Sequence, residues 1–349
     1  MMNTPTRRTA MTLLGSTLLA GATTKSVAQS TDYYAGKQIN MIVGSSVGGG
    51  YDTYARLLAR HWPKYIPGNP LMVVQNLPAA GSLVAMNTLA NTAPKDGTTI
   101  AAVQNHIGVE PLMGVTGPVE NARYDGRTMN WIGSTSKEIP VVVAWSNSPI
   151  KTFRDTFTTE MLVGASGRAT ADSVYSRIMN EILGTKFRVI EGYKGNPELI
   201  LAAESGEIMG RTGWFVSGML ATQGKQIADG KIRVLVQLSP EKHPALPDVP
   251  LITEFITDPE KRAQLEFSLS WLQMGRPFVA PAGVPEDRVR ILRDSFMKTV
   301  QSPDFIAEAA SMTLDVSPMS GEEVQALVRK TYETPPAVIQ RVRAIMTAK

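Results

Sequence analysis

The chain has 349 residues, of which 43% are hydrophobic and 19% are charged. This composition is typical of a globular protein with a sizeable core, and the length predicts one large domain or two ordinary ones. The formal net charge of +4 includes Arg7, Arg8 and Lys25 near the start of the chain, and without them the charges almost balance. Charge therefore gives no argument for a nucleic acid as partner.

The first 28 residues have the pattern of a cleavable export signal. Arg7 and Arg8 precede an apolar run from Ala10 to Ala22, and small residues follow at Ser26 and Ala28. We expect cleavage near Ala28 and a periplasmic destination. The arginine pair suits a twin-arginine route, and a general secretory signal fits equally. The apolar run is shorter than the roughly 20 residues that a membrane-spanning helix needs, and the chain has no cysteine for a lipid anchor.

From residue 39 onward, short runs rich in Val, Ile and Met alternate with helical patterns. This alternation predicts an α/β protein with a mainly parallel sheet covered by helices. Proline-marked breaks near 140 and 149 and at 277–285 indicate where the chain passes between two lobes. The strands are expected at 42–44, 71–76, 99–104, 141–145, 161–166, 187–192 and 232–238, and the helices at 52–62, 80–91, 171–183, 196–205, 286–300 and 321–333.

Residues 39–62 predict a strand, a glycine-rich loop and an amphipathic helix in succession. The start of such a helix has free backbone N–H groups and the positive end of the helix dipole, so the loop suits an anion. A second unit of this form lies at 160–183, and two units facing one another would hold a small dicarboxylate by both ends. Asp52 and Asp172 stand near the two helix starts, where they suit N-terminal capping.

Gly44, Ser46 and Gly48 form a GxSxG pattern between a strand and a helix, which is the setting of a hydrolase nucleophile. An exported α/β-hydrolase that uses Ser46 is therefore an alternative, with His243 as the base that the chain order allows. The sequence has no nucleotide-binding fingerprint, and its three histidines without any cysteine form no recognisable metal site. We expect no cofactor and no metal.

Short phrases spread along the chain are the glycine loop 48–52 followed by ARLLARH, NLPAAGS at 76–82, PKDG at 94–97, GASGRATADS at 164–173, GYKG at 192–195, SGEIMGR at 205–211, ALPDVP at 245–250 and APAGVP at 280–285. Together and in this order, they resemble the substrate-binding proteins of tripartite tricarboxylate transporters, the Bug/TctC family. The resemblance covers nearly all of 33–340.

This resemblance implies a two-lobed periplasmic-binding-protein fold of type II, the Venus flytrap, in the α/β class and without catalytic activity. Such a receptor closes on a small carboxylate, here a di- or tricarboxylate or an aromatic acid, and presents it to the membrane permease subunits of a tripartite tricarboxylate transporter. We expect lobe one at 33–138 plus 272–349 and lobe two at 139–271, in a monomer. A receptor that reports carboxylates to a sensor protein is a second alternative.

The resemblance also implies which residues meet the ligand. In the family, the two glycine loops hold the ligand carboxylates largely through main-chain N–H groups, hydroxyls and bridging waters. The matching residues here are Ser46, Gly48, Gly49 and Gly50 at one end, Ser166, Arg168, Ala169, Thr170 and Asp172 at the other, and Ala80 in the loop 79–82 that would line the same cleft.

Two departures from the family pattern bear on the ligand. GSSV at 44–47 stands where the family commonly has a proline and an aromatic residue, so the hydroxyls of Ser45 and Ser46 replace a drier wall. Arg211 stands where the family often has an acidic residue, and an arginine favours an extra ligand carboxylate over an amino group. We expect Arg211 to face the cleft; a surface ion pair is the alternative.

Overall fold

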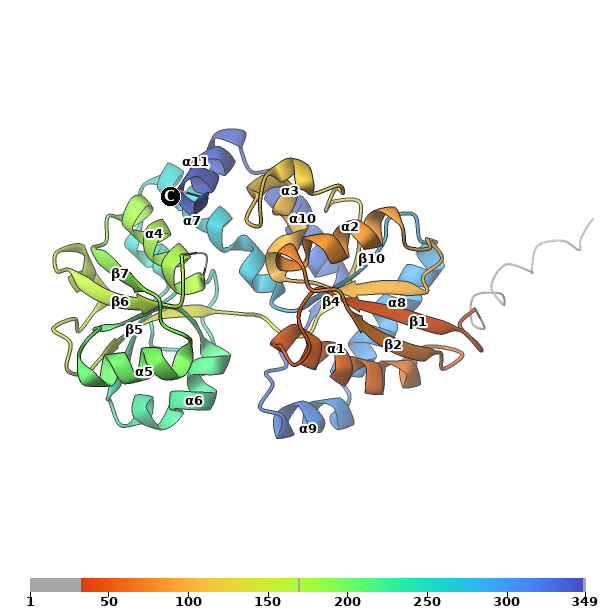
Figure 1. Ribbon diagram of the computed structural model, residues 1–349, viewed down its shortest axis with the longest axis horizontal. Helices are drawn as coiled ribbons and strands as arrows, with labels where there is room; N and C mark the ends of the chain where they lie inside the picture. The colour runs from red at the N-terminus through yellow and green to blue at the C-terminus, as the bar shows by residue number, and fades with distance from the viewer. Residues whose placement is uncertain (1–32, 169, 348–349) are drawn as a thin grey trace, which may run out of the picture.

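The structure is a computed structural model that describes residues 33–168 and 170–347, and it shows two lobes side by side (Figure 1). Each lobe has one β-sheet with helices packed against it. The expected export signal at 1–28 and the expected ligand residue Ala169 lie outside the described residues. Within 33–168 and 170–347, none of the helices has both the length and the apolar character that crossing a membrane requires.

The first lobe contains a six-stranded sheet with the order β11-β4-β10-β3-β1-β2. β1 is parallel to β2 and β3, whereas β10 is antiparallel to β3 and β4. All four residues of β3 are buried, as expected of a strand inside the sheet. The strands are β1 (Gln38–Val43), β2 (Leu71–Asn76), β3 (Thr99–Ala102), β4 (Asn130–Ser134), β10 (Pro277–Ala280) and β11 (Met319–Ser320).

The second lobe contains a five-stranded sheet with the order β7-β6-β8-β5-β9. The sequence predicted a mainly parallel sheet, but both sheets are mixed. β5 and β10 each arrive from the other lobe, without a helical crossover inside their own sheet, and both pair antiparallel with their neighbours. The strands are β5 (Pro140–Trp145), β6 (Met161–Ala165), β7 (Phe187–Glu191), β8 (Gly210–Phe215) and β9 (Ile232–Gln237).

The helices expected at 171–183, 196–205 and 286–300 are confirmed with those bounds, and the helix expected from 52 begins at Gly50. Five further helices were not predicted from the sequence, namely α3, α6, α7, α9 and α11. The helices are α1 (Gly50–His61), α2 (Leu83–Asn91), α3 (Glu110–Met113), α4 (Ala171–Leu183), α5 (Asn196–Ser205), α6 (Val216–Ala228), α7 (Pro259–Leu269), α8 (Glu286–Val300), α9 (Pro303–Ser311), α10 (Gly321–Tyr332) and α11 (Pro336–Thr347).

An aromatic cluster holds α1 and α8 against the first sheet. The Trp62 ring lies 6.3 Å from the Phe278 ring of β10 and 5.4 Å from the Phe296 ring of α8, both edge-to-face. Trp62 is fully buried, and its indole N–H donates to the Ser295 hydroxyl at 2.9 Å, so the polar end of the side chain is satisfied. Ala55, Leu58 and Trp62 are all buried in this cluster, so the amphipathic helix expected from the sequence packs its apolar face on the core.

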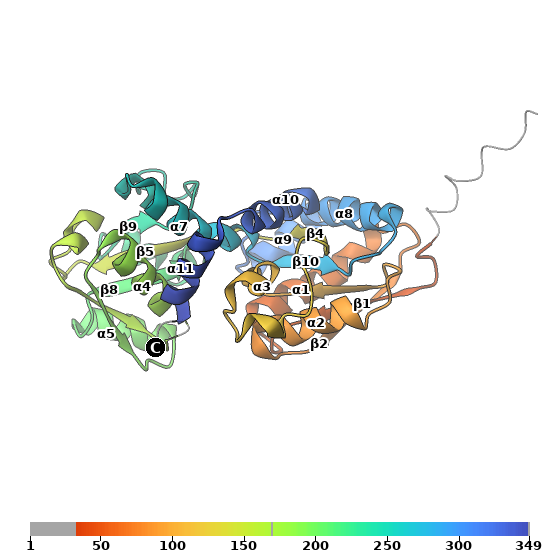
Figure 2. The same ribbon diagram turned by 90° about the horizontal axis from the view of Figure 1, so that it is seen from above.

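The chain passes between the lobes at more than one place. It leaves the first sheet after Ser134 and enters the second at Pro140, and it returns through the 3-10 helix Ser270–Met274 to Pro277. After α10, the terminal helix α11 packs on α4 and α7 (Figure 2). Residues 336–347 therefore contact the second lobe, although the sequence analysis grouped 272–349 with the first.

Candidate functional site

A cavity of about 590 Å³ lies where the two lobes meet. The first lobe contributes the first turn of α1, the turn before α2 and the segment after β3, and the second lobe contributes the start of α4 and the end of β8. Figure 1 shows α1 and α4 starting on the sides of their lobes that face one another. The lining residues are Tyr51, Ala80, Gly81, Gln104, Asn105, His106, Val115, Thr116, Glu138, Ala171, Val174, Tyr175, Phe215, Trp271, Leu272, Arg276 and Met346.

Asp52 fixes the glycine loop ahead of α1. Its carboxylate is only 1% exposed, and it accepts hydrogen bonds from the Gly48 amide at 2.8 Å, from Arg56 at 3.0 Å and from Asn76 at 2.8 Å. Gly48 has a φ of +79°, which favours glycine. The expectation that Asp52 caps the helix is wrong, because Gly49 is the N-cap residue and Asp52 binds the loop instead.

The ionisation of Asp52 follows from these contacts. Burial acts to raise the pKa of its carboxyl, but the hydrogen bonds from Arg56, Gly48 and Asn76 outweigh burial and lower the pKa below its ordinary value of 3.8. The carboxylate is therefore ionised at neutral pH. It holds the loop against the end of β2, so the first amides of α1, which have no partner within a helix, lie in a fixed position beside the cavity.

Arg276 is a charged residue of the cavity lining that was not predicted from the sequence. Its guanidinium lies 4.4 Å from the centre of the Tyr51 ring, and its Nη2 lies 2.9 Å from a carboxylate oxygen of Glu138. A Cβ at Gly50 would be 3.3 Å from Nη2, so the glycine lets the arginine approach the start of α1 closely. The sequence feature that could have identified it is its position, because Arg276 directly precedes the proline-marked crossing at 277–285.

At the start of α4, the charged residues bind one another. Arg211 is 3% exposed, and its guanidinium donates to Asp172 at 3.0 Å and to Asn196 at 2.9 Å while it covers the Trp214 ring. Burial is the main influence on both, raising the pKa of Asp172 and lowering that of Arg211. Asp172 is not a cap, because no side chain caps α4 and Thr170 is its N-cap residue. The pair differs from both sequence-based alternatives for Arg211, since it is neither on the surface nor in the cavity lining.

The structure brings part of the predicted site to the cavity. Ala80 lines it, and so do Tyr51 and Ala171, which directly follow the two predicted loops. Asp172 and Arg211 lie buried beneath the start of α4. The other described residues of the predicted site lie in the loops next to the cavity but outside its lining, namely Ser46, Gly48, Gly49, Gly50, Ser166, Arg168 and Thr170.

His106 adds a neutral polar group to the first-lobe wall. Burial lowers the pKa of its imidazole to about 4, so the ring is uncharged at neutral pH. Its Nε2 is buried and has no hydrogen-bond partner among the described residues. The nearest carboxylate oxygen, from Glu110, is 3.9 Å away, beyond hydrogen-bond range. This wall therefore contains a buried imidazole nitrogen that has no partner among the described residues.

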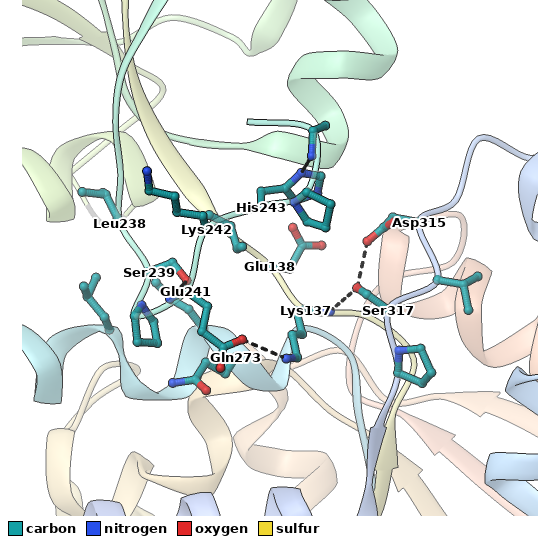
Figure 3. Close-up of a pocket in the computed structure, with 18 residues that line it drawn as sticks. Lys137, Glu138, Leu238, Ser239, Glu241, Lys242, His243, Gln273, Asp315 and Ser317 are labelled. Atoms are coloured by element: carbon teal, nitrogen blue, oxygen red, sulfur yellow. Dashed lines mark hydrogen bonds and ion pairs between the residues drawn. The ribbon is translucent and has the colours of Figure 1, made fainter. Parts of the chain in front are cut away.

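A second cavity, of about 560 Å³, is drawn in Figure 3, and Glu138 lines both cavities. Lys137 lines this second cavity. Its Nζ lies 3.5 Å from a carboxylate oxygen of Glu241, and its backbone amide donates to the Ser317 hydroxyl. His243 lines this second cavity, whereas Ser46 lines neither. Among the described residues, no group of three His, Asp or Glu side chains is placed to hold a metal ion.

The family model described as "Tripartite tricarboxylate transporter family receptor" matches residues 55–343. The chain belongs to this family. The family resemblance inferred from the sequence is thereby confirmed. So is the expectation of a receptor without catalytic activity, because the family and the structural relatives are substrate-binding receptors. The alternative of a hydrolase built on Ser46 is wrong.

Solved structures show the same two-lobed fold. A TctC solute-binding protein from Polaromonas, solved without ligand, is 19% identical with a TM-score of 0.71, over 88% of this chain and 99% of that one. MatC from Rhodopseudomonas palustris with bound malate is 17% identical with a TM-score of 0.54, over 89% and 99%. An R. palustris protein with adipate is 16% identical with a TM-score of 0.58, over 89% and 97%. At these identities the likeness shows the fold alone.

The role of Asp52 predicts a pH-dependent loss of stability in Asp52→Asn. At pH 7 we expect the variant to be less stable by about 1.5–3 kcal/mol, the range for hydrogen bonds to a charged group. Because folding lowers the pKa of Asp52, its stabilisation is complete above the unfolded value of 3.8 and is lost as the pH falls through the lower folded value. The difference from wild type should therefore shrink below about pH 4.

Urea unfolding of both proteins between neutral and acid pH measures this difference. Asp294→Asn is the matched control, since Asp294 is an exposed carboxylate on the helix α8. It should change stability by less than about 0.5 kcal/mol at every pH. A deficit in Asp52→Asn that stays constant across the pH range would contradict the assigned role.

Proposed function

We propose that this solute-binding protein is exported to the periplasm, captures a small carboxylate between its lobes and delivers it to the membrane permease subunits of a tripartite tricarboxylate transporter. The observation that carries the proposal is that the first turns of α1 and α4 line one cavity between the lobes. Both turns present unpaired amides and a positive helix end, which favour a carboxylate. Arg276, which is paired with Glu138, adds a guanidinium beside α1.

The proposed contacts follow the two glycine loops. Main-chain N–H groups and hydroxyls of the first loop, at Ser46 and 48–50, would hold one end of the ligand, and those of the second loop, at Ser166 and 168–170, would hold the other, with Ala80 between them. Relatives with the same fold were solved with the dicarboxylates malate and adipate. We also propose that the lobes comprise 33–138 plus 272–349 and 139–271, with α11 packed across onto the second lobe.

Binding is tested by a thermal-shift screen over malate, adipate, citrate and benzoate, because a ligand that binds only the folded state raises the melting temperature with its concentration. We expect Ala171→Glu to lose binding, since it places a carboxylate in the cavity lining. A carboxylate at a helix start is favourable for folding. The isosteric control Ala171→Gln fills the same space without the charge.

Titration calorimetry should show Ala171→Glu to be weaker than Ala171→Gln by about ten-fold or more, because like charges brought together cost several kcal/mol. Equal affinities in the two variants would remove the start of α4 from the anion site. If none of the acids shifts the melting temperature of the wild type, the carboxylate proposal is wrong.

The two-lobed arrangement predicts closure around the ligand, because the crossing segments 135–139 and 270–276 can act as hinges. Small-angle X-ray scattering should show a smaller radius of gyration at saturating ligand than without it. Ala171→Glu under the same conditions serves as the control and should not contract. Identical curves for wild-type protein with and without bound ligand would count against a closing receptor.

Delivery to a permease predicts that a strain lacking this protein loses uptake of the acid found in the screen. Wild-type protein supplied on a plasmid should restore uptake, whereas Ala171→Glu should not. Detection of the protein in the periplasmic fraction, cut near Ala28, would support export. Normal uptake in the deletion strain, with a lost transcriptional response to the acid, would favour the sensor alternative.

A further inference from the structure

The side chains that line the interlobe cavity contain few charges. Arg276 is the arginine of the lining and Glu138 is its carboxylate, while His106 is neutral at physiological pH because burial lowers its pKa to about 4. Among the residues that the structure describes, the lining contains no lysine and no second arginine. The charges of Arg276 and Glu138 cancel, so these side chains supply no net positive charge, and the helix starts supply the attraction for an anion. This suits one ligand carboxylate better than three, since each further buried charge needs its own partner.

The guanidinium of Arg276 is held in an orientation that suits a ligand carboxylate. The Tyr51 ring packs against one face of the guanidinium, and Glu138 forms an ion pair with Nη2, so the planar group is held in one orientation. Its Nε is buried and has no hydrogen-bond partner within the described part of the chain. Nη2 would lie 3.3 Å from a Cβ at Gly50, so the guanidinium and the unpaired amides at the start of α1 are adjacent. Both groups attract the same anion.

Apart from the start of α4, the opposite wall is apolar. The second lobe and α11 supply Val174, Tyr175, Phe215, Trp271 and Met346 to the lining, and Tyr175 and Trp271 are each at most 5% exposed. A hydroxyl or carboxylate turned toward this wall would lose water without gaining a charged partner. An apolar ring or chain would gain, by about four-fold in affinity for each methylene buried.

From this asymmetry we infer that the cavity selects monocarboxylates with an apolar, ring-sized body, and that Arg276 receives the carboxylate while the second lobe covers the body. The inference rests on the proposed function and narrows its ligand class. The cavity volume of about 590 Å³ accommodates a ligand of this size, since small-molecule sites span roughly 300–1,000 Å³.

The experiment is titration calorimetry of the full-length mature protein with benzoate, phenylacetate and cyclohexanecarboxylate, compared with malate, adipate and citrate. We expect the three apolar-bodied acids to bind at least about ten-fold more tightly than malate and citrate. Adipate, which has a methylene body and a second charge, should fall between the two groups.

Two substitutions test separately the contact of Arg276 with the carboxylate and the contact of the apolar second-lobe wall with the ligand body. Arg276→Gln should weaken benzoate by about ten- to a hundred-fold, the range for a hydrogen bond to a charged group. Arg188→Gln removes an exposed arginine paired with Glu160 and is the matched control, expected within about two-fold of wild type. Phe215→Ala should weaken benzoate by about ten-fold or more and leave malate unchanged.

If Arg276→Gln does not fold because Glu138 loses its partner, the double variant Glu138→Gln/Arg276→Gln removes both charges and should show the same loss of benzoate binding. Tightest binding by malate or citrate, with no effect of Phe215→Ala, would overturn the inference and leave the carboxylate receptor standing. Benzoate affinity unchanged in both Arg276 variants would also overturn it. Failure of all six acids to bind would remove the proposed function itself.

Discussion

The ion pair between Glu138 and Arg276 joins the two segments in which the chain leaves and re-enters the first lobe. Glu138 follows β4 and Arg276 precedes β10, and these strands are neighbours in the sheet. The Glu138 side chain is 5% exposed and that of Arg276 is 21% exposed, so each charge has left most of its water and depends on the other. The position of the crossing segments, and of the first turn of α1 beside them, follows from this pair.

The second lobe has a comparable pair at its own glycine loop. Asp172 and Arg211 bind one another beneath the start of α4, and the Asp172 carbonyl accepts from Thr212, so β8 and α4 are tied together. In the first lobe, Asp52 holds the loop before α1 in place by accepting hydrogen bonds from the Gly48 amide and from Asn76. In both lobes a buried carboxylate beside a glycine loop binds the protein, so that main-chain amides, and not the carboxylates of Asp52 and Asp172, face the space between the lobes.

The two cavities that Glu138 lines differ in the groups that they offer a ligand. The one at the starts of α1 and α4 combines an arginine, an unpartnered imidazole nitrogen and an aromatic wall. In the other, the Lys137 ammonium lies near Glu241, and the Ser317 hydroxyl donates to Asp315 (Figure 3). Arg276 also has a partner in Glu138, but its Nε has none among the described residues, and an unpartnered donor gains more from a ligand than a paired one. The first cavity is therefore the one suited to binding.

The sequence by itself determined the local units. Its hydrophobic periodicity and its glycines placed α1, α4, α5 and α8 to within a few residues, and the two strand–loop–helix units indicated an anion at helix starts, because these features depend on neighbours along the chain. Only the tertiary structure decided which charged groups meet. Asp172 and Arg211 are 39 residues apart, and Arg276 reaches Gly50 across most of the chain. No local pattern records such pairings, since burial and contact between distant segments arise only when the two sheets assemble.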